Sequence, residues 1–72
     1  MTNDTALPPR VRRMIDELAE LKERSDKLVN FIESETYAQL DTTDQGLLST
    51  QLSVMSAYIS VLGTRIYRAH AA

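Results

Sequence analysis

The feature that most constrains this chain is a stretch of twenty residues, Gln45–Thr64, that contains no Lys, Arg, Asp, Glu or His. A helix that faces solvent normally carries charged residues on its outer side. We therefore predict that this stretch belongs to an inner helix, shielded on more than one side. Large apolar side chains recur along it and just beyond it at alternating steps of four and three, as on one face of an α-helix: Leu48, Leu52, Met55, Ile59, Leu62 and Ile66.

The side of this helix opposite the apolar stripe consists of small residues: Ser49, Thr50, Ser53, Ser56, Ala57, Ser60, Gly63 and Thr64. The length suits a membrane span of about 20 residues, but two Gln and six Ser or Thr argue against one. An exposed surface would favour Glu and Lys, which are better helix formers than Ser and Thr. We expect that the small side chains let another helix or a ligand approach closely, with a plain polar surface as the alternative.

Length and composition limit how the chain can be stabilised. A chain of 72 residues forms one small domain that buries only about 60% of its unfolded surface. With no Cys and a single His, we expect no disulfide, no metal and no other cofactor, which leaves self-association as the stabiliser. The net charge of −2 argues against a coat for DNA or RNA. Because no apolar signal segment is visible, we expect a cytoplasmic location.

The chain divides into a tail, two helices and a turn. Pro8 and Pro9 exclude a helix before them and suit the first turn of a helix after them. Similar helix lengths and a short connection predict an all-α fold, an antiparallel helical hairpin of two long helices that assembles into an oligomeric helical bundle. The expected bounds are 1–8 for a flexible tail, about 9–34 for the first helix, 35–42 for the turn and about 43–70 for the second helix.

Local signals support these assignments. Tyr37 and Leu40 are the large apolar residues of the turn, and we expect them to close the end of the hairpin. Asp41 stands where a side chain can cap the second helix. On the first helix, acidic and basic residues four apart predict ion pairs on a solvated face: Glu20–Arg24 and Glu23–Lys27.

A line of polar residues spaced by seven runs within the apolar face of the second helix: Asp44, Gln51, Tyr58 and Arg65. Buried polar groups need partners. When the hairpin is folded about residue 38, Gln51 lies level with Ser25, and Tyr58 lies near Leu18. Two internal pairings are open on this basis, Gln51 with Ser25 and Arg65 with Glu17. The line could instead fix the register of an oligomer or contact a ligand.

Positive charge gathers at one end of the predicted hairpin, where the first helix starts and the second ends: Arg10, Arg12, Arg13, Arg65 and Arg68. Guanidinium groups match phosphates, and the free N–H groups of a helix N-terminus favour anions. Aromatic rings can stack on bases. A solvated basic patch is the alternative. The predicted nucleotide site consists of Arg13, Arg65 and Arg68 for phosphates, Tyr58 and Tyr67 for bases, and Gln51 for a polar edge.

No catalytic arrangement is visible in the sequence. There is no Gly-rich phosphate loop, no Ser-His-Asp set at a plausible spacing and no carboxylate pair within the apolar stripe. We therefore expect no catalytic residues and a protein that is not an enzyme.

A set of short stretches extends over about residues 11–68: Arg13-Met14, Glu17-Leu18, Leu21-Lys22, Lys27-Leu28, Phe31-Ile32, Leu47-Leu48, Gln51-Leu52, Met55, Tyr58, Leu62-Gly63 and Arg65-Ile66. These stretches resemble a group of small tailed-phage helical-hairpin proteins. That group is similar in design to the hairpin sponges that act against the CBASS and Thoeris immune systems of bacteria. The resemblance implies a homo-oligomer, often a hexamer, that traps a cyclic nucleotide second messenger in pockets between protomers without cleaving it.

The resemblance implies a phage anti-defence protein in the cytoplasm of an infected bacterial host, and it assigns no binding residue. The alternative is a structural or regulatory helical adaptor that binds a host or phage protein through the small-residue face of the second helix. A sponge requires arginines that converge on a partly dry pocket. An adaptor requires an exposed groove and tolerates scattered arginines.

Overall fold

The first helix begins at a proline. Pro9 is the first residue of α1 (Pro9–Ile32), where its fixed φ suits the first turn and its missing N–H needs no partner. The computed structural model describes residues 7–71, so the expected tail over residues 1–8 falls mostly outside the described residues. Two further helices follow, α2 (Glu35–Ala38) and α3 (Thr42–Ala71), and no strand occurs within residues 7–71.

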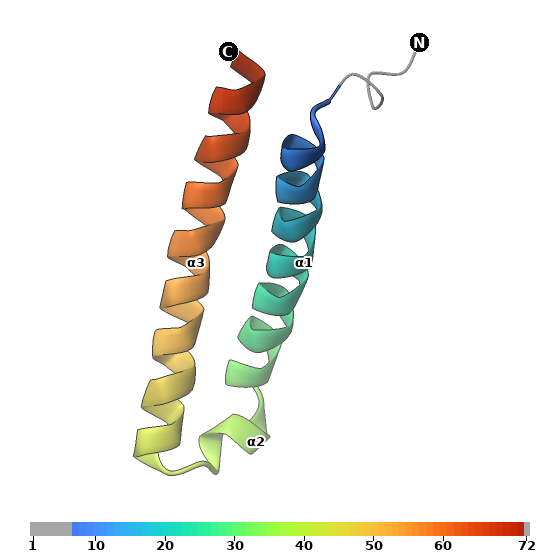
Figure 1. Cartoon of the computed structure of the whole chain (residues 1–72). Helices are drawn as coiled ribbons and strands as arrows, with labels where there is room; N and C mark the ends of the chain where they lie inside the picture. Colours follow the sequence, from blue (N-terminus) through green and yellow to red (C-terminus); the bar gives the residue numbers. More distant parts are fainter. Residues whose placement is uncertain (1–6, 72) are drawn as a thin grey trace.

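α1 and α3 lie side by side and run in opposite directions (Figure 1). α2 lies at the closed end of the pair, whereas the start of α1 and the end of α3 lie together at the open end. This arrangement confirms the predicted all-α antiparallel hairpin. The segment expected as a plain turn contains the single-turn helix α2, so α1 ends at Ile32 instead of residue 34 and α3 begins at Thr42 instead of residue 43.

Tyr37, a residue of α2, contacts both α1 and α3 at the closed end of the hairpin. Its backbone N–H donates to the Oγ of Ser34, which caps α2, at 3.3 Å. Its ring packs edge-on against Phe31 of α1, with the ring centroids 6.2 Å apart. Its hydroxyl donates to the carbonyl oxygen of Gln45 in α3 at 2.9 Å. Tyr37 therefore closes the end of the hairpin, as the sequence predicted.

Gln45 of α3 also stabilises the closed end of the hairpin through hydrogen bonds. Its Nε2 donates to three carbonyl oxygens in and just beyond α2: Tyr37 at 3.0 Å, Leu40 at 3.2 Å and Ala38 at 3.3 Å. The end of a helix leaves such carbonyls without partners of their own. Asp41 caps α3 as predicted, since its Oδ1 accepts a hydrogen bond from the backbone N–H of Asp44 at 2.8 Å.

The seam between α1 and α3 contains a small core. Val11 and Leu62 are almost completely buried, Leu21 and Ser25 are also buried, and the remaining apolar residues of the seam are half-buried. The radius of gyration is 16.2 Å, against about 11 Å for a compact domain of this length. The hairpin is therefore a rod with one narrow line of internal contact.

The outer side of α1 is solvated, as predicted. The expected ion pairs Glu20–Arg24 and Glu23–Lys27 are present, with nitrogen–oxygen distances of 3.8 and 3.7 Å. All four side chains are largely exposed, so each pair contributes only about 0.3–0.5 kcal/mol. These charges give α1 a water-facing side that needs no cover.

α3 is shielded on one side only, which differs from the expected shielding on more than one side. Leu47, Val54 and Val61 are 64%, 62% and 54% exposed. Within Thr42–His70, an 18-residue window reaches a mean hydropathy of 1.2 and is 6% buried, so length and composition alone would permit a membrane span. The correction has a simple cause: a single neighbouring helix covers about one side of α3 and leaves the rest of its apolar surface open.

We predict that Gln45→Glu lowers the free energy of unfolding by about 1–3 kcal/mol. The new carboxylate keeps the shape of the side chain but places an acceptor where the amide donates to three carbonyl oxygens. Urea unfolding followed by circular dichroism measures the loss. Gln39→Glu is the matched control, because Gln39 is exposed and we expect a change of less than about 0.5 kcal/mol. Equal losses in the two variants would contradict the role assigned to Gln45.

Candidate functional site

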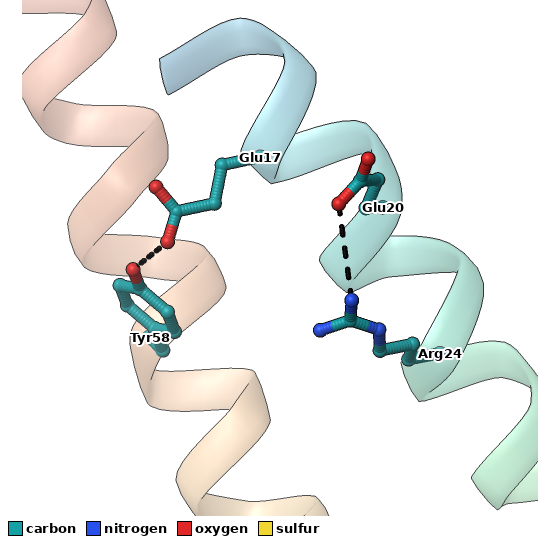
Figure 2. A network of polar contacts seen from close by, with 4 residues as sticks. All are labelled: Glu17, Glu20, Arg24 and Tyr58. Carbon is teal, nitrogen blue, oxygen red and sulfur yellow. Dashed lines mark hydrogen bonds and ion pairs between the residues drawn. The ribbon is translucent and has the colours of Figure 1, made fainter. Parts of the chain in front are cut away.

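A hydrogen bond between Tyr58 of α3 and Glu17 of α1 crosses the seam between the helices. Figure 2 shows the two side chains pointing toward each other, and the Tyr58 hydroxyl donates to Oε2 of Glu17. Glu17 is adjacent to Leu18, the residue that folding about residue 38 places near Tyr58. The contact therefore agrees with the predicted register to within one residue. Glu17 itself is absent from the predicted set of site residues.

This contact changes the acidity of Tyr58. The hydrogen bond to Glu17 raises the pKa of the Tyr58 hydroxyl above its ordinary value of 10.0, because deprotonation would remove the bond and oppose two negative charges. Desolvation acts in the same direction, and the positive charge of Arg65 acts in the opposite one. The electrostatic effect of Arg65 indicates that its guanidinium group lies near the Tyr58–Glu17 pair.

Neither of the two internal pairings left open by the sequence is formed. Ser25 is buried, whereas Gln51 is exposed, and no hydrogen bond joins them. Glu17 accepts its hydrogen bond from Tyr58 and is not ion-paired with Arg65. Within the described part of the chain, Gln51 and Arg65 therefore remain available for contacts outside the single hairpin.

The two tyrosines of the predicted site lie on opposite sides of α3. Residues seven apart in an α-helix are rotated by only about 20°, so Gln51, Tyr58 and Arg65 form one row. Tyr67 follows Tyr58 by nine residues, which is a rotation of about 180°. Tyr67 is also 72% exposed. Within a single chain only Tyr58 lies in the same row as Arg65, so the stacking of both rings on one ligand stays a prediction that requires more than one chain.

The predicted arginines lie at the open end of the hairpin, as antiparallel pairing requires. Arg13 is exposed near the start of α1, and Arg65 and Arg68 are exposed near the end of α3. Among residues 7–71, none of these three has an ion-pair partner. Exposed guanidinium groups without ion-pair partners at one end of a chain of net charge −2 form a suitable surface for an anion.

Arg10 lies at the same end of the hairpin, on the side of α1 that faces the row containing Arg65. It precedes Glu17 by seven residues and therefore lies on the same side of α1. Because Glu17 meets Tyr58, the antiparallel register places Arg10 level with Arg65. The sequence assigned Arg10 to the basic cluster but not to the binding residues, since only the contact across the seam identifies which side of α1 faces this row.

A shallow pocket of about 290 Å³ lies beside Arg65 on the outer surface of α3, lined by Ser60, Val61, Thr64 and Arg65. Its surface is formed almost entirely by apolar atoms of these four residues. Arg68 follows Thr64 by four residues and lies on the same side of the helix. Sequence reasoning recognised Ser60 and Thr64 as small but did not single them out; their spacing of four beside an arginine is the signal that could have done so.

The groups in the pocket and in the row beside it limit the kinds of ligand that this surface can hold. No group of three or more His, Cys, Asp or Glu residues that could hold a metal occurs within the described residues. The pocket surface is almost entirely apolar carbon, although two of the lining residues carry a hydroxyl and one carries a guanidinium group; none of them carries a carboxylate or an imidazole. This combination can hold an anion with an attached flat or apolar part.

We predict that the difference in unfolding free energy between the wild type and Tyr58→Phe depends on pH. A raised pKa in the folded protein means that the Tyr58–Glu17 bond contributes its full stability below pH 10 and loses it as pH rises through the raised pKa. Urea unfolding from pH 8 to pH 11.5 should therefore show a difference that shrinks. Tyr67→Phe, which removes an exposed ring hydroxyl, is the control. A constant difference for Tyr58→Phe across this range would contradict the contact.

Comparison with known proteins identifies a family to which the chain is similar. The model of the family described as Sequestin matches residues 8–68, which include α1, α2 and nearly all of α3. The matched region contains every residue of the predicted site, from Arg13 to Arg68. No curated protein and no solved structure is significantly similar to the chain. The family description indicates sequestration, which is binding without a catalytic step.

Proposed function

Because the chain belongs to the Sequestin family, we propose that it binds a small anionic signal and sequesters it without chemical change. The ligand that we propose is a cyclic nucleotide second messenger of the kind that CBASS or Thoeris immunity employs. The protein would then be a phage anti-defence sponge in the cytoplasm of an infected bacterial host. The family match supports sequestration, and the chemistry of the open end supports the nature of the ligand.

The observation that carries the proposal is an arginine without an ion-pair partner among the residues that line an apolar pocket. Arg65 has no ion-pair partner among the described residues and lines the pocket together with Val61. Its planar guanidinium can bind a phosphate through two parallel hydrogen bonds, and Arg68 lies on the same side of α3 to add a second charge. The apolar surface of the pocket suits a base or a ribose, which a free inorganic anion lacks.

The remaining predicted residues extend the proposed site from two directions. Tyr58 and Gln51 lie in the row that ends at Arg65, so they can contact the same ligand from within one chain. Tyr67 lies about 180° from Tyr58 around α3 and can reach a ligand held there only from another protomer. This geometry supports pockets between protomers of a homo-oligomer, for which we propose a hexamer. Arg13 adds positive charge from α1.

Isothermal titration against a panel of cyclic dinucleotides, cyclic trinucleotides and cyclic ADP-ribose isomers tests this proposal. We expect one class to bind, and Arg65→Ala to weaken its binding by about 10–100-fold, the value of one charge-assisted hydrogen bond. Arg24→Ala is the matched control, because Arg24 lies on the outer side of α1, where it is paired with Glu20 (Figure 2). It should leave the affinity unchanged.

Heat denaturation of the complex tests sequestration separately from binding. The ligand recovered from the denatured protein should be intact by mass spectrometry. Recovery of a cleaved product would contradict sequestration and indicate an enzyme. Absence of binding to every member of the panel at high micromolar concentration would contradict the nucleotide proposal and favour the helical adaptor.

A further inference from the structure

Three apolar residues on α3 form an exposed row that no part of the hairpin covers. Leu47, Val54 and Val61 are spaced by seven residues and are 64%, 62% and 54% exposed. Each precedes a residue of the stripe that faces α1, so the row lies about 100° around α3 from that stripe. No charged residue occurs between Gln45 and Thr64, and covering this row therefore requires no desolvation of a charge along its length.

A row of four polar residues lies beside the apolar row, and its chemistry matches that of a second copy of the same row running in the opposite direction. Its members occur in the order Asp44, Gln51, Tyr58, Arg65, and all four are exposed. When a second copy of the row runs in the opposite direction, each acid meets a base and each amide meets a phenol. The Tyr58 hydroxyl already donates to Glu17, so its oxygen remains free to accept a hydrogen bond from an amide such as that of Gln51.

We propose that the exposed row is covered by α3 of a second copy of this chain, packed antiparallel about a two-fold axis near Val54. A two-fold axis that relates antiparallel helices brings the same flank of each helix together, so the polar row meets itself in reverse. Val54 then packs on Val54 of the partner subunit, and Leu47 on Val61 of the partner subunit. Asp44 lies beside Arg65 of the partner subunit, and Gln51 beside Tyr58 of the partner subunit.

Charge complementarity selects this arrangement over its competitors. Arg68 continues the apolar row by one more step of seven, and the proposed register places it near Asp41 of the partner subunit. A shift by one heptad would instead bury Leu47 against an arginine. A parallel pair would place Asp44 beside Asp44 and Arg65 beside Arg65 of the partner subunit, and it would align the two helix dipoles. Only the antiparallel register pairs all three apolar residues and opposes unlike charges.

The other flank of the row permits a close approach. It consists of Thr50, Ala57 and Thr64, whose small side chains do not hold two helix backbones apart. Leu47 of the partner subunit then lies against Val61, which lines the pocket beside Arg65. Ser56 and Gly63 lie on the far side of α3, outside this contact. Arg65, Tyr58 and Gln51 belong to this contact as well as to the proposed nucleotide site, so the tests of the association contain no nucleotide.

Cysteine cross-linking determines the orientation, and the chain has no native Cys to interfere. Val54→Cys should form a cross-linked dimer on mild oxidation, because the two positions meet at the two-fold axis. Leu47→Cys and Val61→Cys should each cross-link poorly alone and well when the two proteins are mixed. Efficient cross-linking of Leu47→Cys with itself would overturn the antiparallel arrangement.

Charge reversal tests the polar row. Asp44→Arg and Arg65→Asp should each at least halve the mass of the assembly measured by analytical ultracentrifugation, because like charges then face each other. An equimolar mixture of the two variants should recover the wild-type mass, since each chain complements the other. Failure of the mixture to associate, when both variants retain helical circular dichroism, would overturn the proposed pairing.

The apolar row is tested against the small-residue face. Val54→Glu should dissociate the wild-type assembly, whereas Ser56→Glu, which adds the same charge about 160° away around α3, should not. The opposite result would place the contact on the small-residue face and overturn the proposal. A wild-type chain that remains monomeric at micromolar concentration would overturn it as well. Recovery of the chain only in detergent-extracted membranes would overturn it in favour of lipid as the cover of α3.

Discussion

Two helices packed side by side can shield only one side of each other, and this limit determines the rest of the molecule. The side of α1 that α3 does not cover carries charged residues, such as Glu20 and Arg24. α3 has no charge from Gln45 to Thr64 and leaves Leu47, Val54 and Val61 largely exposed. The two helices are therefore unequal: one is adapted to water, and the other carries the surface that binding and association require.

The parts of the structure that the sequence predicted depend on short-range patterns. The four-three spacing of Leu48, Leu52 and Met55 identifies the face of α3 that meets α1, because a helix repeats nearly every seven residues. Asp41 was recognised as a cap because the bond it accepts lies three residues away. The ion pair Glu20–Arg24 was predicted for the same reason. Such features need no knowledge of how the two helices align.

The parts that the sequence did not predict depend on contacts across the seam. The hydrogen bond between Tyr58 and Glu17 joins residues that are 41 apart in the sequence. To predict it, one must know the register of the two helices to within one residue and the direction in which each of the two side chains points. Tyr67 was grouped with Tyr58 by its distance along the chain, although the rotation between them separates the rings. The pocket beside Arg65 is likewise a property of shape, which a list of small residues does not reveal.

The hydrogen bonds of the closed end also imply an order of events in folding. Tyr37 and Gln45 are only 8 residues apart, whereas Tyr58 and Glu17 are 41 apart. Closing the longer loop first would cost about 1.4 kcal/mol more chain entropy than closing the shorter one. We therefore expect folding to start at the end that contains Tyr37 and Gln45 and to proceed toward the arginines.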